Sequence, residues 1–467
     1  VTRLELGTND DDFHLLADGG IKNYPADAAW FADVHQFSAN HAAIASVVST
    51  ATGKDVPAII SRIGDVSLTG YIGGEHNKLA ANVRVSTSLG NIRAAVDKCK
   101  NSITGHIETV DFNVGKLADD NKLGHLSANI NIHGQSEDNM SAIGCVYNFD
   151  YNGYKYRDIN LDASYRFKAV EGRVEIDDPN AQISASGQLN IASETPLLKA
   201  NVSVGRFAPN SLHLTQKWQS TAFAANISCD INGSSVNDAD GTVEIRDFSM
   251  LSPKSEYGLR NVTVRTGFDG DNHFLNLNSD FGQVNINGHF NYNTIARSVL
   301  NMVAAKLPTI PGLTRQPQKE VNDFTINASI SNTDWMKYLL GIPLEIYSPL
   351  NISGELNDKH EKIDLWCDVP SFAYDGNRFS DAFVNIESPN DTLKADIRIK
   401  KLADKGKYMS LQLSAGASDN HLNTSLSFGN NERHPLKGVI NASTVFAKNI
   451  DGVSTAYVDV LPSRATI

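Results

Sequence analysis

Two stretches of this chain repeat one pattern, and that pattern decides the fold. The first is YNGYKYRDINLDASY (Tyr151–Tyr165) and the second is YDGNRFSDAFVNIES (Tyr374–Ser388). Each has Tyr, then Asn or Asp, Gly, one free position, a cation, an aromatic ring, one free position and Asp. Alternating apolar and polar residues follow in both. The recurrence favours a repeated supersecondary unit over coincidence, although Asn-Gly turns flanked by aromatic residues are common in β proteins.

The dipeptide after each Tyr predicts a tight turn. Asn-Gly and Asp-Gly favour two-residue type I′ turns, because both central residues need a positive φ and these residue types tolerate it. Tyr, Phe and β-branched residues on either side favour strands. We therefore predict β-hairpins with tips at Asn152 and Gly153 and at Asp375 and Gly376.

Alternation with a period of two extends over most of the chain and predicts about 30–40 strands of roughly 5–8 residues. In LSANINIH (126–133), for example, every second residue is apolar. Each strand then has one apolar face, and a few short helices cannot cover so large a surface. The sheet must cover itself as separate sandwiches, as a closed solenoid, or as a trough. Few linker-like stretches interrupt the chain, so we predict a mainly β fold: an elongated, continuous, twisted, antiparallel-rich sheet folded lengthwise into a hydrophobic groove.

Helical signals are few, and they set the predicted organisation. Residues 1–65 form a mixed segment with a helix at 38–53. Residues 66–307 form a first β block that ends in a helix at 294–307, which we interpret as capping or plugging the trough. A Pro-rich loop at 308–323 leads to a second β block at 324–467, with a short helix at 333–341.

The length, composition and net charge of the chain exclude some classes of partner. The chain has 467 residues, 41% of them hydrophobic, and a net charge of −12, which argues against nucleic acid and anionic membrane surfaces as partners. No apolar run approaches the roughly 20 residues of a membrane helix. The chain begins with Val1, so we interpret it as an excerpt of a longer protein. Its four cysteines are interpreted as free structural thiols, three of them, including Cys145, at apolar-face positions of strands.

No motif predicts catalysis, a metal site or a cofactor, so we do not expect an enzyme. His133 and His289 fall on polar strand faces. The acidic stretches 177–180 and 237–241 are flanked by strands, which predicts hairpin turns rather than calcium loops.

The order of several longer motifs resembles the TamB family of translocation-and-assembly-module proteins, especially those of Bacteroidota. The stretches that carry this resemblance are FNVGKLADDNKLGHLSANINIHGQ (112–135), YNGYKYRDINLDASY (151–165), GRVEIDDPNAQISASGQLNIAS (172–193), DFSMLSPKSEYGLRNVTV (247–264), LNSDFGQVNINGHFNYNTI (277–295), LPTIPGL (307–313), SNTDWMKYLLGIPLEI (331–346) and CDVPSFAYDGNRFSDA (367–382). Each motif alone has low specificity; their order makes the resemblance.

The resemblance implies an AsmA-like bridge protein of the periplasm. Such a protein is anchored in the inner membrane by an N-terminal helix and contacts an outer-membrane Omp85-type barrel through a C-terminal domain. Neither the anchor nor that domain is identified in this chain, which therefore corresponds to the middle of the bridge. The family's two attributed roles are phospholipid transport between the membranes and assembly or secretion of outer-membrane proteins.

Our leading hypothesis is a periplasmic conduit that carries phospholipid in the groove. The predicted lining residues are Leu126, Ala128, Ile130, Ile132, Val202, Val204, Ile227, Val284, Ile286, Phe290, Ile326, Ile330, Ile397 and Ile399. Plain core packing is the alternative for each of them. The second hypothesis is a scaffold whose edge strands template outer-membrane β-strands. The third is a self-packed β-solenoid without cargo, against which small residues such as Ala81, Ala225 and Gly288 argue because they leave room.

Overall fold

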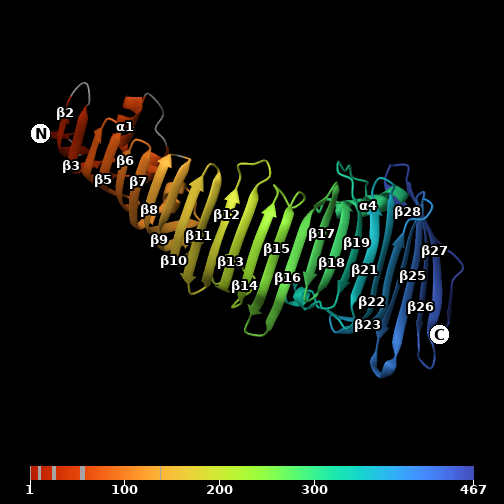
Figure 1. Ribbon diagram of the computed structural model, residues 1–467. Helices are drawn as coiled ribbons and strands as arrows, with labels where there is room; N and C mark the ends of the chain where they lie inside the picture. Colours follow the sequence, from red (N-terminus) through yellow and green to blue (C-terminus); the bar gives the residue numbers. More distant parts are fainter. Residues whose placement is uncertain (1, 9–11, 24–27, 53–57, 137, 467) are drawn as a thin grey trace. The chain divides into compact units, whose positions relative to one another are not determined.

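The fold is mainly β. The computed structural model describes residues 2–8, 12–23, 28–52, 58–136 and 138–466. These residues form one long, continuous antiparallel sheet of 29 strands that does not close on itself, with a few short helices (Figure 1). The predicted continuous antiparallel sheet is confirmed. Its strands are slightly fewer and often longer than predicted, and the longest reach 14 residues.

The chain divides into two compact units, which we describe separately. Unit 1 comprises Val1–Ser228 and Ser249–Glu256, and unit 2 comprises Cys229–Phe248 and Tyr257–Ile467. The strands that lie wholly in unit 1 are β1 (Thr2–Gly7), β2 (Phe13–Lys22), β3 (Ala29–Ala39), β4 (Val66–Glu75), β5 (Lys78–Thr87), β6 (Gly90–Cys99), β7 (Ser102–Asn113), β8 (Leu123–Ser136), β9 (Asn139–Tyr151), β10 (Tyr154–Arg166), β11 (Ala169–Asp178), β12 (Ala181–Asn190) and β13 (Leu197–Phe207).

Three strands, β14 (Ala222–Asn232), β15 (Asp240–Leu251) and β16 (Glu256–Asp269), include the points of division. The strands of unit 2 are β17 (Asn272–Ser279), β18 (Gly282–His289), β19 (Asp323–Ile330), β20 (Leu344–Ile346), β21 (Leu350–Asn357), β22 (Lys362–Tyr374), β23 (Asn377–Glu387), β24 (Leu393–Leu402), β25 (Tyr408–Ser418), β26 (His421–Asn430), β27 (Lys437–Lys448), β28 (Ser454–Val460) and β29 (Arg464–Thr466).

The helices are α1 (His41–Thr52), α2 (Ala58–Ile63), α3 (Val114–Ala118), α4 (Ile295–Lys306), the π-helical turn η1 (Met336–Leu340) and the 3₁₀ turn η2 (Asp404–Gly406). Three of them, α1, α4 and η1, lie close to where the sequence predicts them, whereas α2, α3 and η2 were not predicted. Helix α1 begins later than predicted because β3 extends to Ala39, and the Asn40 side chain caps the helix by accepting a hydrogen bond from the backbone N–H of Ala43 at 2.8 Å. The predicted helix at 294–307 is confirmed as α4.

The two repeated stretches form the predicted hairpins. Tyr151 pairs with Tyr154 across the β9–β10 turn, whose central residues have φ of 52° and 77°. Tyr374 pairs with Asn377 across the β22–β23 turn, where the values are 47° and 74°. Both turns therefore have the two positive φ values of a type I′ turn. The acidic stretches 177–180 and 237–241 are also turns between strands, as predicted.

The last Asp of the repeated pattern has a role that the sequence did not reveal. Asp158 in β10 and Asp381 in β23 lie inside strands with φ of 50° and 49°, and Asp111 in β7 has the same conformation at 53°. The register of β7 with β8 shifts at Asp111, and that of β23 with β24 shifts at Asp381. Such an extra residue bends the strand and moves the following side chains to the opposite face.

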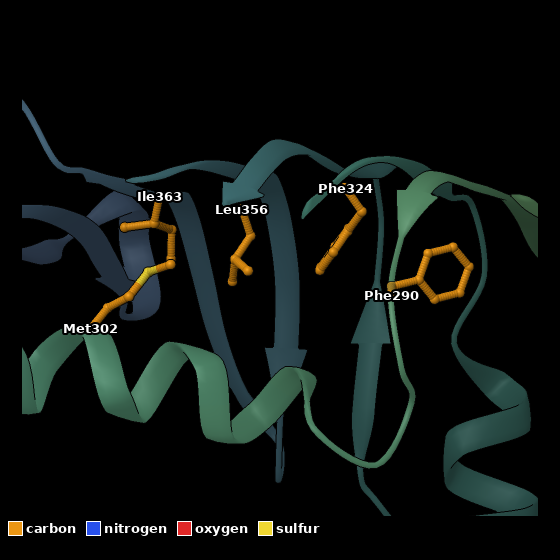
Figure 2. Packing of buried hydrophobic residues seen from close by; sticks show 5 residues of the cluster. All are labelled: Phe290, Met302, Phe324, Leu356 and Ile363. Carbon is orange, nitrogen blue, oxygen red and sulfur yellow. The ribbon is translucent and has the colours of Figure 1, made fainter. Parts of the chain in front are cut away.

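The best-packed core of unit 2 lies between the sheet and α4. Phe290, Met302, Phe324, Leu356 and Ile363 are each 4–8% exposed and form one cluster. Figure 2 shows Met302 extending from α4 towards the strands that carry Leu356 and Ile363. A second cluster joins Leu307, just after α4, to β25 and β27. The helix covers apolar surface that the sheet alone would leave exposed.

Candidate functional site: the apolar face of the sheet

The apolar residues of unit 1 form rows that run across the strands. Pairing places Ile130 of β8 and Val202 of β13 in one row, although they are far apart in sequence. Side chains two residues apart along a strand point to the same face, so the row that lies two residues further along each strand shares this face. The first row consists of Ile130, Gly144, Leu161, Val174, Ala185 and Val202, and the second of Ala128, Val146, Ile159, Ile176, Ile183 and Val204.

A third row of unit 1 is made of small residues over most of its length. It consists of Ile132, Ala142, Ala163, Gly172, Gly187 and Ala200. Beyond it, near the ends of the strands, lies a rim row in which Val170, Leu189 and Leu198 are 44%, 41% and 41% exposed. Rows two residues apart along a strand are about 7 Å apart. Side chains along most of this row are shorter than those of the rows on either side, and we call the row the furrow of unit 1.

Unit 2 repeats this arrangement. One row contains Leu275, Ile286, Ile326, Gly354, Leu365 and Ile386. The next row contains Leu277, Val284, Ala328, Ile352, Cys367, Val384, Ile397, Leu413, Leu426 and Ile440. The rows continue from strand to strand without a charged residue among these members.

Helix α4 covers the row that lies nearest the strand ends in unit 2. Phe324, Leu356 and Ile363 form the terminal row, and α4 packs on it through Met302. Ile286 and Ile326 of the next row pack against the same cluster and are partly buried. These contacts agree with the prediction that this helix caps the apolar surface.

Further along unit 2 the apolar face is more exposed. Ile397 in β24, Leu411 in β25 and Ile440 in β27 are 36%, 40% and 45% exposed. Contiguous exposed apolar surface in a folded protein marks a site that contacts another apolar molecule or surface. This part of the face is the candidate binding surface of unit 2, as the rim and furrow are in unit 1.

Most of the residues predicted to line the groove lie on the apolar face of the sheet. In unit 1, Leu126, Ala128, Ile130, Ile132, Val202 and Val204 share the apolar face, and Ile227 is half-buried on β14. In unit 2, Val284, Ile286, Ile326 and Ile397 belong to the rows above, and Ile399 pairs with Leu411 on the same face. Ala128, Phe290 and Ile330 are 4%, 7% and 8% exposed, so these three are packed residues rather than open surface.

The position predicted for Cys145 is wrong. Cys145 pairs with Asn129 and Asn160 on the polar face, beside Ile143 and Tyr147, which are 50% and 48% exposed. The register of β8 with β9 skips Tyr147, so the alternation in β9 changes face at that point. Cys367, by contrast, lies in an apolar row as predicted.

Burial sets the protonation of several groups. It raises the pKa of the Cys145, Cys229 and Cys367 thiols, and nearby aspartates add to the effect. Burial pulls the pKa of the Lys306 ammonium down, but hydrogen bonds to Asp391 and Glu361 outweigh it, so the net pKa is raised. The thiols are thus neutral near pH 7, which makes them weak nucleophiles.

An aromatic stack at the edge of the α4 cluster was not foreseen from the sequence. His273 is 3% exposed and lies between the rings of Phe268 and Phe290, at centroid distances of 4.7 Å and 4.3 Å. Burial lowers its pKa, so the ring is neutral at pH 7. Its Nε2 lies 2.9 Å from the Thr266 hydroxyl. No spacing in the sequence marks this contact, because the three rings come from different strands or connections.

In the described part of the chain, the His, Cys, Asp and Glu side chains include no group of three placed to hold a metal ion. None of its helices has the length and apolar character needed to cross a bilayer.

Comparison of the chain with protein-family models, with curated proteins and with solved structures finds no match.

Proposed function

We propose that this protein holds the acyl chains of phospholipid on the apolar face of its sheet and conducts them across its strands. The observation that carries the proposal is the set of uninterrupted apolar rows. They run perpendicular to the strands, which is the direction in which a sheet grows, so each strand lengthens the apolar path.

The dimensions and exposure of the rows suit an acyl chain. The furrow of unit 1 is lined by Ala and Gly and bordered by larger residues, so a chain can lie in it without displacing packed side chains. The exposed rim row adds apolar contact at its border. Burial of apolar area, at roughly 25 cal/mol per Å2, supplies the binding free energy without any specific polar group.

The resemblance to the TamB family suggests where in the cell the protein would work. The protein would work in the periplasm, as the middle of a bridge between an inner-membrane anchor and an Omp85-type outer-membrane barrel. The rows would then form the wall of the groove expected from that resemblance.

A second candidate function is a scaffold for assembly of outer-membrane proteins. Strand β28 supports this second function. Its Tyr457, Val458 and Val460 are 53%, 59% and 72% exposed, and it pairs with β27. An exposed strand of this kind can pair with a segment of another chain.

The test is native mass spectrometry of the gently purified chain with lipid extraction. Val174 and Val202 belong to one apolar row, whereas Ser186 and Asn201 pair on the polar face of the same region. We expect co-purifying phospholipid in the wild type and in the control Ser186→Asp/Asn201→Asp. The variant Val174→Asp/Val202→Asp should lose most of it.

A folded, lipid-free wild type would contradict the conduit and favour the scaffold. Equal lipid in both double variants would show that the rows of unit 1 are not the binding surface.

A further inference from the structure

The segment that carries α4 is an insertion between two neighbouring strands. Residues 290–322 leave the sheet after β18 and return at β19, and the flanking residues His289 and Asp323 pair directly with each other. We call residues 290–322 the α4 flap. Because it leaves and rejoins the sheet at one point, its displacement need not break any pairing of β18 with β19.

Apolar contacts hold the α4 flap in the two clusters. Its buried members are Phe290, where the flap leaves the sheet, Met302 and Leu307, supported by partly buried residues such as Val299 and Val303. The opposite side of the helix faces solvent, where Leu300 is 52% exposed. A helix of 12 residues is marginal in isolation, so these contacts and the polar ones below hold it on the sheet.

Polar groups hold the start of α4 and the last residue of the flap to the β21–β22 turn. The Ser298 hydroxyl donates to Asp358 Oδ2 at 2.7 Å, and the backbone N–H of Asn322 donates to the same oxygen at 2.8 Å. Asn322 Nδ2 also donates to Ser298 Oγ at 2.7 Å. Ser298 and Asn322 are 0% exposed. Buried hydrogen bonds of this kind define one position but add little net stability, because water satisfies the same groups when they separate.

The second half of the flap is held by charges. The Lys306 ammonium is buried and contacts Asp391 and, at 3.4 Å, Glu361. Arg315, in the loop after the helix, lies 3.0 Å from the other oxygen of Glu361. If the flap moves away, water can solvate each of these charged side chains. Their separation therefore leaves no unpaired charge in an apolar interior.

A hollow that is open to solvent borders the flap. It has a volume of about 490 Å3 and lies between the helix, the loop that follows it and the β21–β22 turn. Its walls include Ser298, Met302, Arg315 and Asp358, so it borders both the polar contacts and the apolar cluster. On this side, therefore, the flap is not closely packed against the β21–β22 turn.

We propose that the α4 flap is a releasable cover of the apolar rows in unit 2. This inference rests on the proposed function. In the closed position Ile286, Ile326 and Leu365 pack against its cluster and are partly buried. Its release adds these residues to the exposed surface around Ile397 and lets an acyl chain occupy the rows that α4 covers.

Thiol labelling tests release without any lipid. In a background of Cys99→Ser, Cys145→Ser, Cys229→Ala and Cys367→Ala, Met302→Cys reports the flap. Ile330→Cys, which is also buried but lies at the other end of β19, reports global opening of the strand. We expect maleimide to label Met302→Cys at least tenfold faster. Equal rates would show that α4 is a fixed part of the core.

Amide hydrogen exchange of the wild type provides the same comparison without substitutions. Peptides from α4 should exchange at least tenfold faster than peptides from β19. Equal protection of the two elements would overturn the inference even if Met302→Cys loosened the packing.

A reversible disulfide tests the link to lipid. The Thr309 hydroxyl and backbone N–H both donate to Asn420 Oδ1, at 2.9 Å and 2.8 Å, so Thr309→Cys/Asn420→Cys joins the flap, just after α4, to the β25–β26 turn. The probe is fluorescently labelled phosphatidylethanolamine, transferred between phosphatidylethanolamine–phosphatidylglycerol vesicles. We expect oxidation to slow transfer at least fivefold and dithiothreitol to restore it.

Equal transfer by the oxidised and reduced protein would overturn the releasable cover. If the reduced protein and the wild type transfer no lipid, the proposed function fails, and the labelling and exchange results still decide whether the flap opens.

Discussion

The apolar rows of unit 1 and unit 2 are built from the same alternation, but they are covered differently. In unit 1 the substantial helix contact with the sheet is that of the short α3 with β8, and the rim residues are about two-fifths exposed. In unit 2 a helix inserted between two neighbouring strands packs on the terminal row and buries it. The difference teaches that alternation alone produces a half-exposed face, and that a true core needs an additional layer.

The largest effect that separates the two units is expected from truncating a leucine. Leu356 is 5% exposed beneath α4, whereas Leu189 is 41% exposed in the rim row of unit 1. Leu356→Ala should lower the free energy of unfolding by about 2–4 kcal/mol, because it leaves a cavity in a packed cluster. Leu189→Ala should lower it by less than about 1 kcal/mol, because that side chain is only half removed from water.

Urea unfolding of both variants, with hydrogen exchange to assign the loss to a unit, measures this contrast. A similar loss in the two variants would mean that the rim of unit 1 is packed as tightly as the α4 cluster.

A second contrast between the units is their dependence on pH. Burial lowers the pKa of His273, so its folded-state pKa lies below the unfolded value of about 6.5. The unfolded chain then binds the proton more readily, and stability falls as the pH drops below about 6.5, by at most about 1.4 kcal/mol per pH unit. Protonation would also place a charge between the rings of Phe268 and Phe290, where water is excluded.

The measurement is hydrogen exchange of β17 and of β12 at pH 7.5 and pH 5.5, corrected for intrinsic rates. Protection should fall at low pH in β17, and His273→Phe should remove most of that fall. The exposed His289 provides the control, since His289→Gln should leave the wild-type pH dependence intact. A His273→Phe variant that keeps the full dependence would assign it to other groups.

Much of the sheet could be predicted from sequence, and the errors have one physical source. Period-two patterns located strands and the face of residues such as Ile130 and Ile326 correctly, because each strand obeys its own alternation. Alternation fails where a strand contains an extra residue. At Asp158, opposite Tyr147, the apolar positions change parity, which is why Cys145 was placed on the wrong face.

The signal for these irregularities was present but ambiguous. Asp tolerates the left-handed conformation better than most residues, and both copies of the repeated pattern carry Asp at the irregular position. An Asp within a strand is also an ordinary solvent-exposed residue, so one sequence could not distinguish the two. The contacts of the α4 flap were beyond prediction for a different reason, since Ser298, Asn322 and Asp358 meet only through the tertiary fold.

The smallest expected effect concerns the repeated hairpins, the feature in which the two units are most alike. Gly153 and Gly376 have φ of 77° and 74°, a conformation that costs other residues roughly 1 kcal/mol. An added Cβ would meet nothing closer than His213 Nδ1 at 3.5 Å in the first case, and nothing within 4 Å in the second. Gly153→Ala and Gly376→Ala should therefore each lower the free energy of unfolding by about 1 kcal/mol, from backbone conformation alone.

The matched control for these turns is Gly416→Ala, since Gly416 lies in a strand without a positive φ and has room for a Cβ. That substitution should be neutral or slightly stabilising, because it reduces the conformational freedom of the unfolded chain. Urea unfolding of the three variants makes the comparison. A much larger loss for Gly153→Ala than for Gly376→Ala would mean that the contacts of residues 208–221 with the first hairpin, such as that of Asn152 with the His213 carbonyl, constrain its tip beyond the turn itself. The two copies would then share a turn but not an energetic role.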